Sequence, residues 1–188
     1  MANLVMDGVT LASKSGSDVT IQNTNVKFPA GHIVKIVQSL KTNAETGDTT
    51  SYADVGDLSA TITPSSESNK IMIMIDIHVS GQDENISFWR CVRNGSTFFT
   101  NSSNSGAEDG SMWSYYSRTT NFSSMHYQGM RQSFNYLDSP STTSALTYKI
   151  QARVYDSSYP WRCNQGDSVS SSARITPVSS VTLMEIVG

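Results

Sequence analysis

Residues 58–79, LSATITPSSESNKIMIMIDIHV, restrict the fold of this chain more than any other stretch. From Ile71 to Val79 every odd position is a β-branched apolar residue, whereas the even positions change from methionine to polar residues. This period of two predicts a central β-strand with one face on a core. Met72 and Met74 predict that its first half is covered on both faces. The Pro-Ser turn at 63–66 predicts a hairpin with the strand that precedes it.

Alternating apolar residues predict a set of further strands, at 33–40, 86–92, 97–100, 146–154 and 180–187. Asn94-Gly95 is a strong signal for a two-residue hairpin turn, because both residues tolerate positive φ. The last strand is expected to run beside the first. No stretch has a helical period, and a count of roughly eight strands predicts an all-β fold, an antiparallel β-sandwich or jelly roll.

Residues 1–30 differ from the main domain, which is predicted at 31–188. They contain two short strand-like runs around a Ser-Gly turn, and too few apolar residues to build a core. Such an extended β segment is stable when it packs on another body or pairs with copies of itself. Its apolar residues are Val5, Val9, Leu11, Val19 and Ile21.

Charge and hydropathy exclude several classes of protein. Only 15% of the 188 residues are charged, and the net charge of −3 argues against a nucleic-acid binder, which normally presents a basic face. No run of about 18 apolar residues is present, so no membrane insertion is predicted. The first residues lack the basic and apolar regions of a signal peptide, so we expect the product to accumulate where it is made, or to leave by assembly or lysis.

Cysteine and histidine give no sign of a metal or cofactor. Cys91 and Cys163 are too few for a disulfide framework, and either two reduced thiols or a single bridge fits the sequence. His32, His78 and His126 are scattered, without the spacing of a metal site. We therefore predict no metal and no cofactor.

Carboxylates give little support for hydrolysis. A glycan-cleaving enzyme needs two carboxyl groups at a defined separation. Glu108 and Asp109 lie in a polar insertion, and nothing in the sequence relates them to Asp138. Asp138 precedes Pro140 and is expected to hold that bend as an Asx turn. No catalytic residues are predicted.

The polar insertion at 101–121 is the one stretch with a specific functional interpretation. Its aromatic residues, with Trp161 on a second predicted loop, are suited to stack on sugar faces beside polar donors. The alternative is that the rings pack on the domain or on a neighbouring subunit. The candidate residues for binding a glycan or receptor are Trp113, Tyr115, Tyr116, Arg118 and Trp161.

Several phrases together resemble a family of jelly-roll-like tail-fibre or virion appendage proteins from phages of marine bacteria and cyanobacteria. The resemblance covers about residues 28–187, and the insertion at 101–121 departs from it. The phrases are FPAGHIVKIVQ (28–38), LSATITPSSESNKIMI (58–73), FWRCVRNGS (88–96), NYLDSPSTTSALTYKIQARV (135–154) and VTLMEI (181–186).

The resemblance implies a non-enzymatic virion protein that is assembled in the host cytoplasm and forms a homotrimer. The N-terminal segment would dock on other virion proteins, and the loops would contact a host glycan or protein. A capsid decoration or cement protein is the alternative, and a small glycan-cleaving enzyme is a third hypothesis. Copy number per particle separates the first two, and turnover of a polysaccharide identifies the third.

Overall fold

The computed structural model describes residues 2–6, 9–15, 17–21, 28–81, 86–99, 111–116, 129–166 and 177–188. The chain divides into two compact units, Met1–His32 and Ile33–Gly188, so the division lies two residues after the predicted boundary. The regular structure of both units consists of β-strands, which confirms the predicted all-β class. The described residues contain no helix long and apolar enough to cross a membrane.

The first unit is a small antiparallel sheet in the order β1-β2-β3. Its strands are β1 (Ala2–Met6), β2 (Val9–Ser15) and β3 (Asp18–Ile21). The sequence predicted two strands around a turn. The structure has three, with that turn between β2 and β3. Leu4 and Val5 on β1 are 63% and 50% exposed, so this sheet leaves apolar surface open to solvent.

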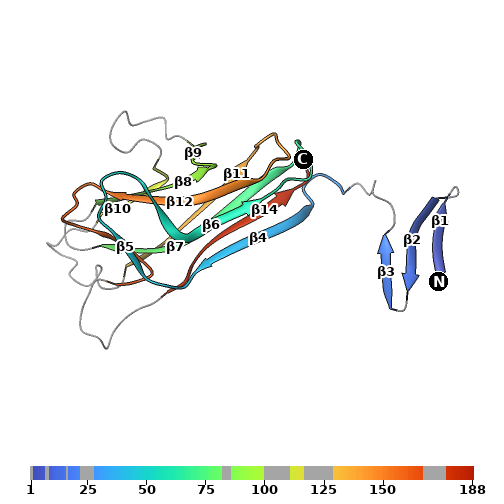
Figure 1. The fold of residues 1–188 in the computed structure, drawn as a ribbon, viewed down its shortest axis with the longest axis horizontal. Coiled ribbons are helices and arrows are strands. Elements are labelled where there is room, and N and C mark those ends of the chain that lie inside the picture. Colours follow the sequence, from blue (N-terminus) through green and yellow to red (C-terminus); the bar gives the residue numbers. More distant parts are fainter. Residues whose placement is uncertain are drawn as a thin grey trace. The chain divides into compact units, whose positions relative to one another are not determined.

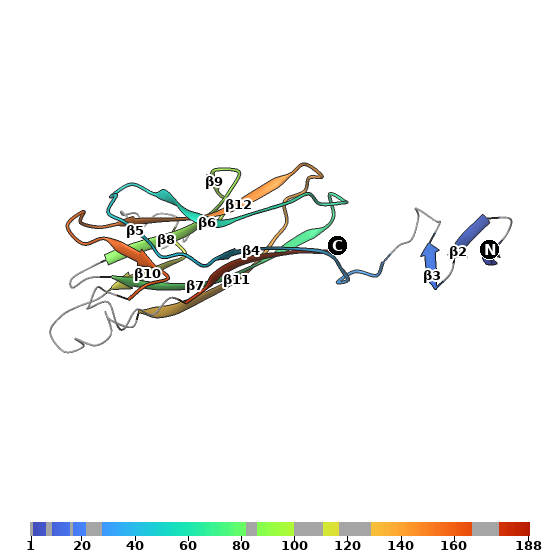
Figure 2. The same ribbon diagram turned by 60° about the horizontal axis from the view of Figure 1, so that its bottom comes forward.

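The second unit is a β-sandwich of two antiparallel sheets, seen as two layers in Figures 1 and 2. The six-stranded sheet has the order β4-β14-β7-β13-β5, with β11 also on β7, and the five-stranded sheet has the order β10-β8-β12-β6, with β9 on β8. The strands are β4 (Ile33–Lys41), β5 (Glu45–Gly47), β6 (Ala53–Ile62), β7 (Lys70–Gly81), β8 (Ile86–Arg93), β9 (Ser96–Thr97), β10 (Trp113–Tyr116), β11 (Met130–Asp138), β12 (Leu146–Val154), β13 (Trp161–Cys163) and β14 (Ser179–Ile186).

Strand order identifies the sandwich as a jelly roll. Along most of β7 its neighbours are β14 and β11, which gives the four-strand path β4-β14-β7-β11. The opposite path is β6-β12-β8-β10. The chain alternates between these paths in the way that two Greek keys require. The predicted pairing of the last strand with the first is confirmed, because β14 runs antiparallel to β4.

The predicted hairpin of residues 58–79 is wrong. β6 pairs with β12 in one sheet, and β7 pairs with β14, β11 and β13 in the other. The turn at 63–69 is therefore a crossover between sheets, and the apolar faces of β6 and β7 both contribute to the core between the sheets. Alternation specifies which face of a strand is buried, and it does not specify which strand lies beside it.

The central position of β7 and its core face are confirmed. Ile71, Ile73, Ile75 and Ile77 are each at most 1% exposed. The expectation for the opposite face is wrong, because Met74 is 40% exposed. The covered end of that face is the polar one, where His78 and Ser80 are buried under the strand ends at β13 and β14.

The predicted Asn94-Gly95 turn is confirmed. Both residues have positive φ, 50° and 80°, and β8 and β9 pair across them. Asn94 also accepts a hydrogen bond from the Thr147 amide through its side chain, at 2.8 Å. The turn thus joins β12 to the hairpin. The predicted strand at 146–154 is present as β12, with Tyr148 and Ile150 fully buried.

A buried carboxylate fixes the crossover between β6 and β7. Glu185 on β14 is fully buried, and its Oε1 accepts hydrogen bonds from the Ser65 amide, the Ser65 hydroxyl and the Asn69 side chain, each at 2.6 Å. The Lys35 ammonium lies 3.6 Å from Oε2. Burial raises the pKa of this carboxyl, and the hydrogen bonds and Lys35 lower it by more, so the pKa lies below its ordinary value.

We expect Glu185→Gln to lower the free energy of unfolding at pH 7 by about 2–3 kcal/mol, because three donors lose a charged acceptor. A depressed pKa stabilises the folded state above the pKa of the unfolded chain, and this stabilisation is lost as pH falls through the folded value. The difference between wild type and variant should therefore shrink below about pH 4. Urea unfolding from pH 7 to pH 3 measures it, with the exposed Glu67→Gln in the same turn as control. A difference that is independent of pH would contradict this account.

Candidate functional site

The aromatic residues that the sequence placed on loops lie mainly on strands. Trp113 and Tyr115 are on β10, which pairs with β8 at the edge of the five-stranded sheet, and Trp161 is on β13. Tyr115 is 4% exposed and Trp161 is 2% exposed. Neither ring offers a face to a ligand in solution, so the prediction that these two residues bind a glycan or receptor is corrected. Short strands within irregular stretches carry too few alternations to be recognised in the sequence.

Trp89 is the centre of a buried aromatic cluster. Its ring meets that of Trp161 edge-on with centroids 5.3 Å apart, and it stacks with Trp113 at 6.5 Å. Trp113 in turn lies 6.4 Å from Phe134 on β11. The cluster therefore joins β8 and β10 of one sheet to β11 and β13 of the other. This arrangement corresponds to the packing alternative that the sequence left open.

Tyr116 alone among the described candidate residues is well exposed, at 57%. It follows Tyr115 on β10, so its side chain lies on the outer side of the five-stranded sheet. Arg118 lies outside the described residues. Tyr116 therefore remains as the aromatic candidate for a contact with a ligand.

The five residues predicted to dock the N-terminal segment all lie on strands of the first unit. Val5 is on β1, Val9 and Leu11 are on β2, and Val19 and Ile21 are on β3. The side chain of Val5 is half exposed. The side chains of the other four lie outside the described part of the structure.

An apolar row crosses the outer face of the six-stranded sheet, and the sequence did not predict it. Ile36 on β4 pairs with Met184 on β14, Met184 pairs with Met72 on β7, and Met72 pairs with Leu137 on β11. Paired residues project to the same side of a sheet, so the four side chains form one row. We call them the apolar row.

The apolar row is open to solvent within the chain. Ile36 is 59% exposed and Leu137 is 41% exposed, while the two methionines between them are partly covered. Met74 on the same face and Leu40 on β4 extend the apolar surface, at 40% and 54% exposure. This exposed apolar surface makes the apolar row a candidate contact site.

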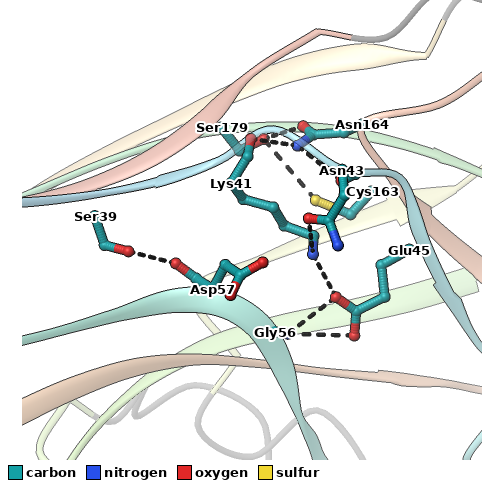
Figure 3. A network of polar contacts seen from close by, with 9 residues as sticks. All are labelled: Ser39, Lys41, Asn43, Glu45, Gly56, Asp57, Cys163, Asn164 and Ser179. Carbon is teal, nitrogen blue, oxygen red and sulfur yellow. Dashed lines mark hydrogen bonds and ion pairs between the residues drawn. The ribbon is translucent and has the colours of Figure 1, made fainter.

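A polar network occupies the end of the sandwich near β5 (Figure 3). Lys41 is fully buried, and its ammonium lies 2.6 Å from Glu45 and donates to the Asn43 side chain at 3.0 Å. Glu45 also accepts two hydrogen bonds from the Gly56 amide, at 3.0 and 3.2 Å. The network thereby ties β4 and β5 to β6 of the opposite sheet.

The same network continues to β13 and β14. Asn164 donates to the Lys41 carbonyl at 2.7 Å and accepts a hydrogen bond from the Ser179 hydroxyl at 2.5 Å. The Cys163 sulfur lies 3.9 Å from that hydroxyl. Burial raises the pKa of the Cys163 thiol to about 12, so the thiol is protonated at neutral pH and is a poor nucleophile. These contacts stabilise the sandwich.

The two cysteines are free and buried, one in each sheet. Cys91 is on β8 and Cys163 is on β13, and burial raises the pKa of the Cys91 thiol to about 12 as well. The sequence allowed either two reduced thiols or a single disulfide bridge. The structure has two reduced thiols. Within the described ranges no group of three histidine, cysteine or carboxylate side chains is arranged to hold a metal ion.

Asp138 forms a buried ion pair at the end of β11. Its Oδ2 accepts hydrogen bonds from the Arg93 guanidinium and from the Tyr148 hydroxyl, both at 2.6 Å. Burial first and Asp138 second raise the pKa of Tyr148 above its ordinary value. The expected Asx turn is therefore replaced by a contact that ties β11 to β8 and β12 of the other sheet.

Comparison with known proteins gives no family for this chain. No protein-family model matches it, and no curated protein matches it in sequence.

Proposed function

We propose that the chain is a bacteriophage virion structural protein, a non-enzymatic tail-fibre or receptor-binding appendage that forms a homotrimer. The apolar row on the six-stranded sheet is the observation that carries the proposal. A jelly roll alone hosts many functions, whereas this surface and the phrases that resemble the phage family support this one.

Self-association explains why the row is apolar. A residue such as Ile36 on an edge strand of a sheet that faces water is normally polar or charged. Burial of one fully exposed side chain of this kind contributes about 1.5–3 kcal/mol, and the four residues of the row, already partly covered, each contribute a fraction of that on association. Asp76 and Arg131, paired at 2.7 Å on the same face, provide the polar rim of such a contact.

The N-terminal sheet is proposed to attach the protein to other virion proteins. Leu4 and Val5 on β1 are 63% and 50% exposed, and a partner that covers these residues would stabilise the small sheet. The main domain has its own core of some twenty described buried residues within Ile33–Gly188. We therefore assign attachment to the first unit and not to this core.

Contact with a host glycan or protein is assigned to the outer side of the main domain, where Tyr116 is exposed. The polar networks around Lys41 and Asp138 each join strands of the two sheets, which gives both a structural role.

Removal of residues 1–27 should leave the domain Ile33–Gly188 folded and unable to join particles. Its circular dichroism and melting temperature should stay within a few degrees of the full chain. Immunogold labelling of particles from cells that make each form measures incorporation, and gold on the tail is expected with the full chain. Gold on the head would assign the protein to capsid decoration instead, and unlabelled particles would contradict a virion role.

A further inference from the structure

A second surface feature lies on the outer face of the five-stranded sheet. Arg153 on β12 pairs with Phe88 on β8, and Arg90 on β8 pairs with Gln151 on β12. Between these pairs, Trp89 and Ala152 are fully buried in the core. The two arginines therefore lie on the side of the sheet that faces away from the core, two positions apart.

Both guanidinium groups stack on one tyrosine. The Arg90 guanidinium lies 3.9 Å from the centroid of the Tyr52 ring, and the Arg153 guanidinium lies 5.4 Å from it. Arg153 also lies 4.2 Å from the Phe88 ring. The residues before β6 cover this part of the sheet, since the Thr49 carbonyl accepts a hydrogen bond from the Val154 amide at 2.9 Å. The guanidinium groups of Arg90 and Arg153 therefore lie close together at a partly covered position on the sheet.

Two donors at this place are buried and unsatisfied. Arg153 is only 8% exposed, and its Nη2 has no hydrogen-bond acceptor. The Tyr52 hydroxyl is also buried and has no partner. Buried polar groups in folded proteins are almost always hydrogen-bonded, so two buried donors on residues in ring contact, both without an acceptor among the described residues, indicate a missing acceptor. Ring stacking offsets part of the desolvation of the guanidinium, but it supplies no acceptor.

The positive charge has no counterion within the described part of the chain. Asp54, the nearby carboxylate on β6, is bound to Lys149 at 2.8 Å and to Gln151 at 2.7 Å. Arg90 donates only to the neutral Gln151 side chain, at 2.9 Å. Burial lowers the pKa of Arg90 most; Tyr52 raises it, and the like charge of Arg153 adds a smaller lowering.

We propose that Arg90, Arg153 and Tyr52 form a binding site for a small oxyanion group. Guanidinium forks match the geometry of sulfate, phosphate and carboxylate, and the tyrosine hydroxyl adds a further donor. Such a group can arrive as a free inorganic anion or on an acidic sugar. The site is independent of the proposed virion role, because it depends only on contacts within the main domain.

Titration of the full chain with sodium sulfate, against sodium chloride at equal ionic strength, tests the site. Wild type should show a saturable rise in melting temperature with sulfate, because a ligand that binds only the folded state stabilises it. Arg153→Met should abolish that rise. It should also melt at or above the wild-type temperature in chloride, because it removes a buried charge that has no partner.

Tyr52→Phe serves as a second variant, because it keeps the stacked ring and removes only the hydroxyl. It should weaken sulfate binding about tenfold. Lys70→Met is the matched control, since Lys70 is exposed at the start of β7 on the other sheet, and sulfate should bind this variant as it binds wild type. A sulfate effect that persists in Arg153→Met, or no saturable effect on wild type, would overturn the proposal.

A second arm of the experiment distinguishes the two sources of the anion. Isothermal titration compares inorganic sulfate and phosphate with a digalacturonate and with its neutral methyl ester. Competition of digalacturonate with sulfate, at higher affinity than sulfate, assigns the site to an anion carried on a sugar. Binding of the inorganic anions alone assigns it to a free anion. No heat from any of the charged probes would refute an oxyanion site.

Discussion

Replacement of Ile36 and Leu137 together by lysine should convert the proposed homotrimer to a monomer of 20.5 kDa. These residues are the two ends of the apolar row, and in the proposed assembly each would be covered by another subunit. An unpaired charge in a buried contact costs about 3–5 kcal/mol, so two such charges per subunit weaken association by several orders of magnitude. Light scattering at matched concentrations measures the change.

The fold should survive this double substitution. Ile36 and Leu137 are 59% and 41% exposed within one chain, so lysine at these positions changes the stability of the isolated domain by little. Thr61→Lys, an exposed position on the outer face of the five-stranded sheet, is the control and should keep the wild-type mass. An unchanged mass for the double variant would show that the apolar row lies outside the subunit contact.

Trp161→Ala is expected to destabilise the main domain by about 4 kcal/mol, because removal of a large buried ring leaves a cavity that the surroundings fill only in part. The ring of Trp161 contacts Trp89, and it lies so close to β5 that a Cβ atom on Gly47 would be 2.6 Å from it. The loss should lower the melting temperature by about 10 °C in a domain of this size.

Tyr116→Ala is the matched comparison for Trp161→Ala. Tyr116 is 57% exposed, so its replacement should change the free energy of unfolding by no more than about 0.5 kcal/mol. Any effect of Tyr116→Ala on host adsorption would then reflect a lost contact and not a lost fold. A Trp161→Ala variant as stable as wild type would mean that this ring is dispensable to the core.

Strands with a long alternation of apolar and other residues can be predicted from the sequence. β7 and β12 each have four or five apolar residues at a period of two, and a pattern of that length determines which face is buried. The Asn94-Gly95 turn was found for a local reason, since few other residues tolerate positive φ. β13 has only three residues, which are too few to show such a pattern, so the sequence predicts a loop for Trp161.

Partner strands and outer faces could not be derived in the same way. A hairpin and a crossover between sheets both begin with a turn such as 63–69, and the contact that decides between them is with Glu185, more than a hundred residues later. Met72 and Met74 predicted that both faces of this end of the strand are covered. A sequence pattern shows that a face is apolar, and it does not show whether the cover comes from the same chain or from another.

The sites for charged groups depend on pairs that only the fold brings together. Arg90 and Arg153 are separated by 63 positions in the sequence, and they become neighbours through the register of β8 and β12. Asp138 was assigned to a turn because Pro140 follows it, whereas its partners Arg93 and Tyr148 come from other strands. Local composition carries no information on such pairs.

The solution mass of the wild-type chain tests the central claim most directly. Light scattering of the purified full chain across a hundredfold range of concentration should give a mass close to three times 20.5 kDa, with the apolar row covered between subunits. A constant mass of 20.5 kDa over the whole range would contradict the proposed homotrimer and leave the apolar row for a different virion protein.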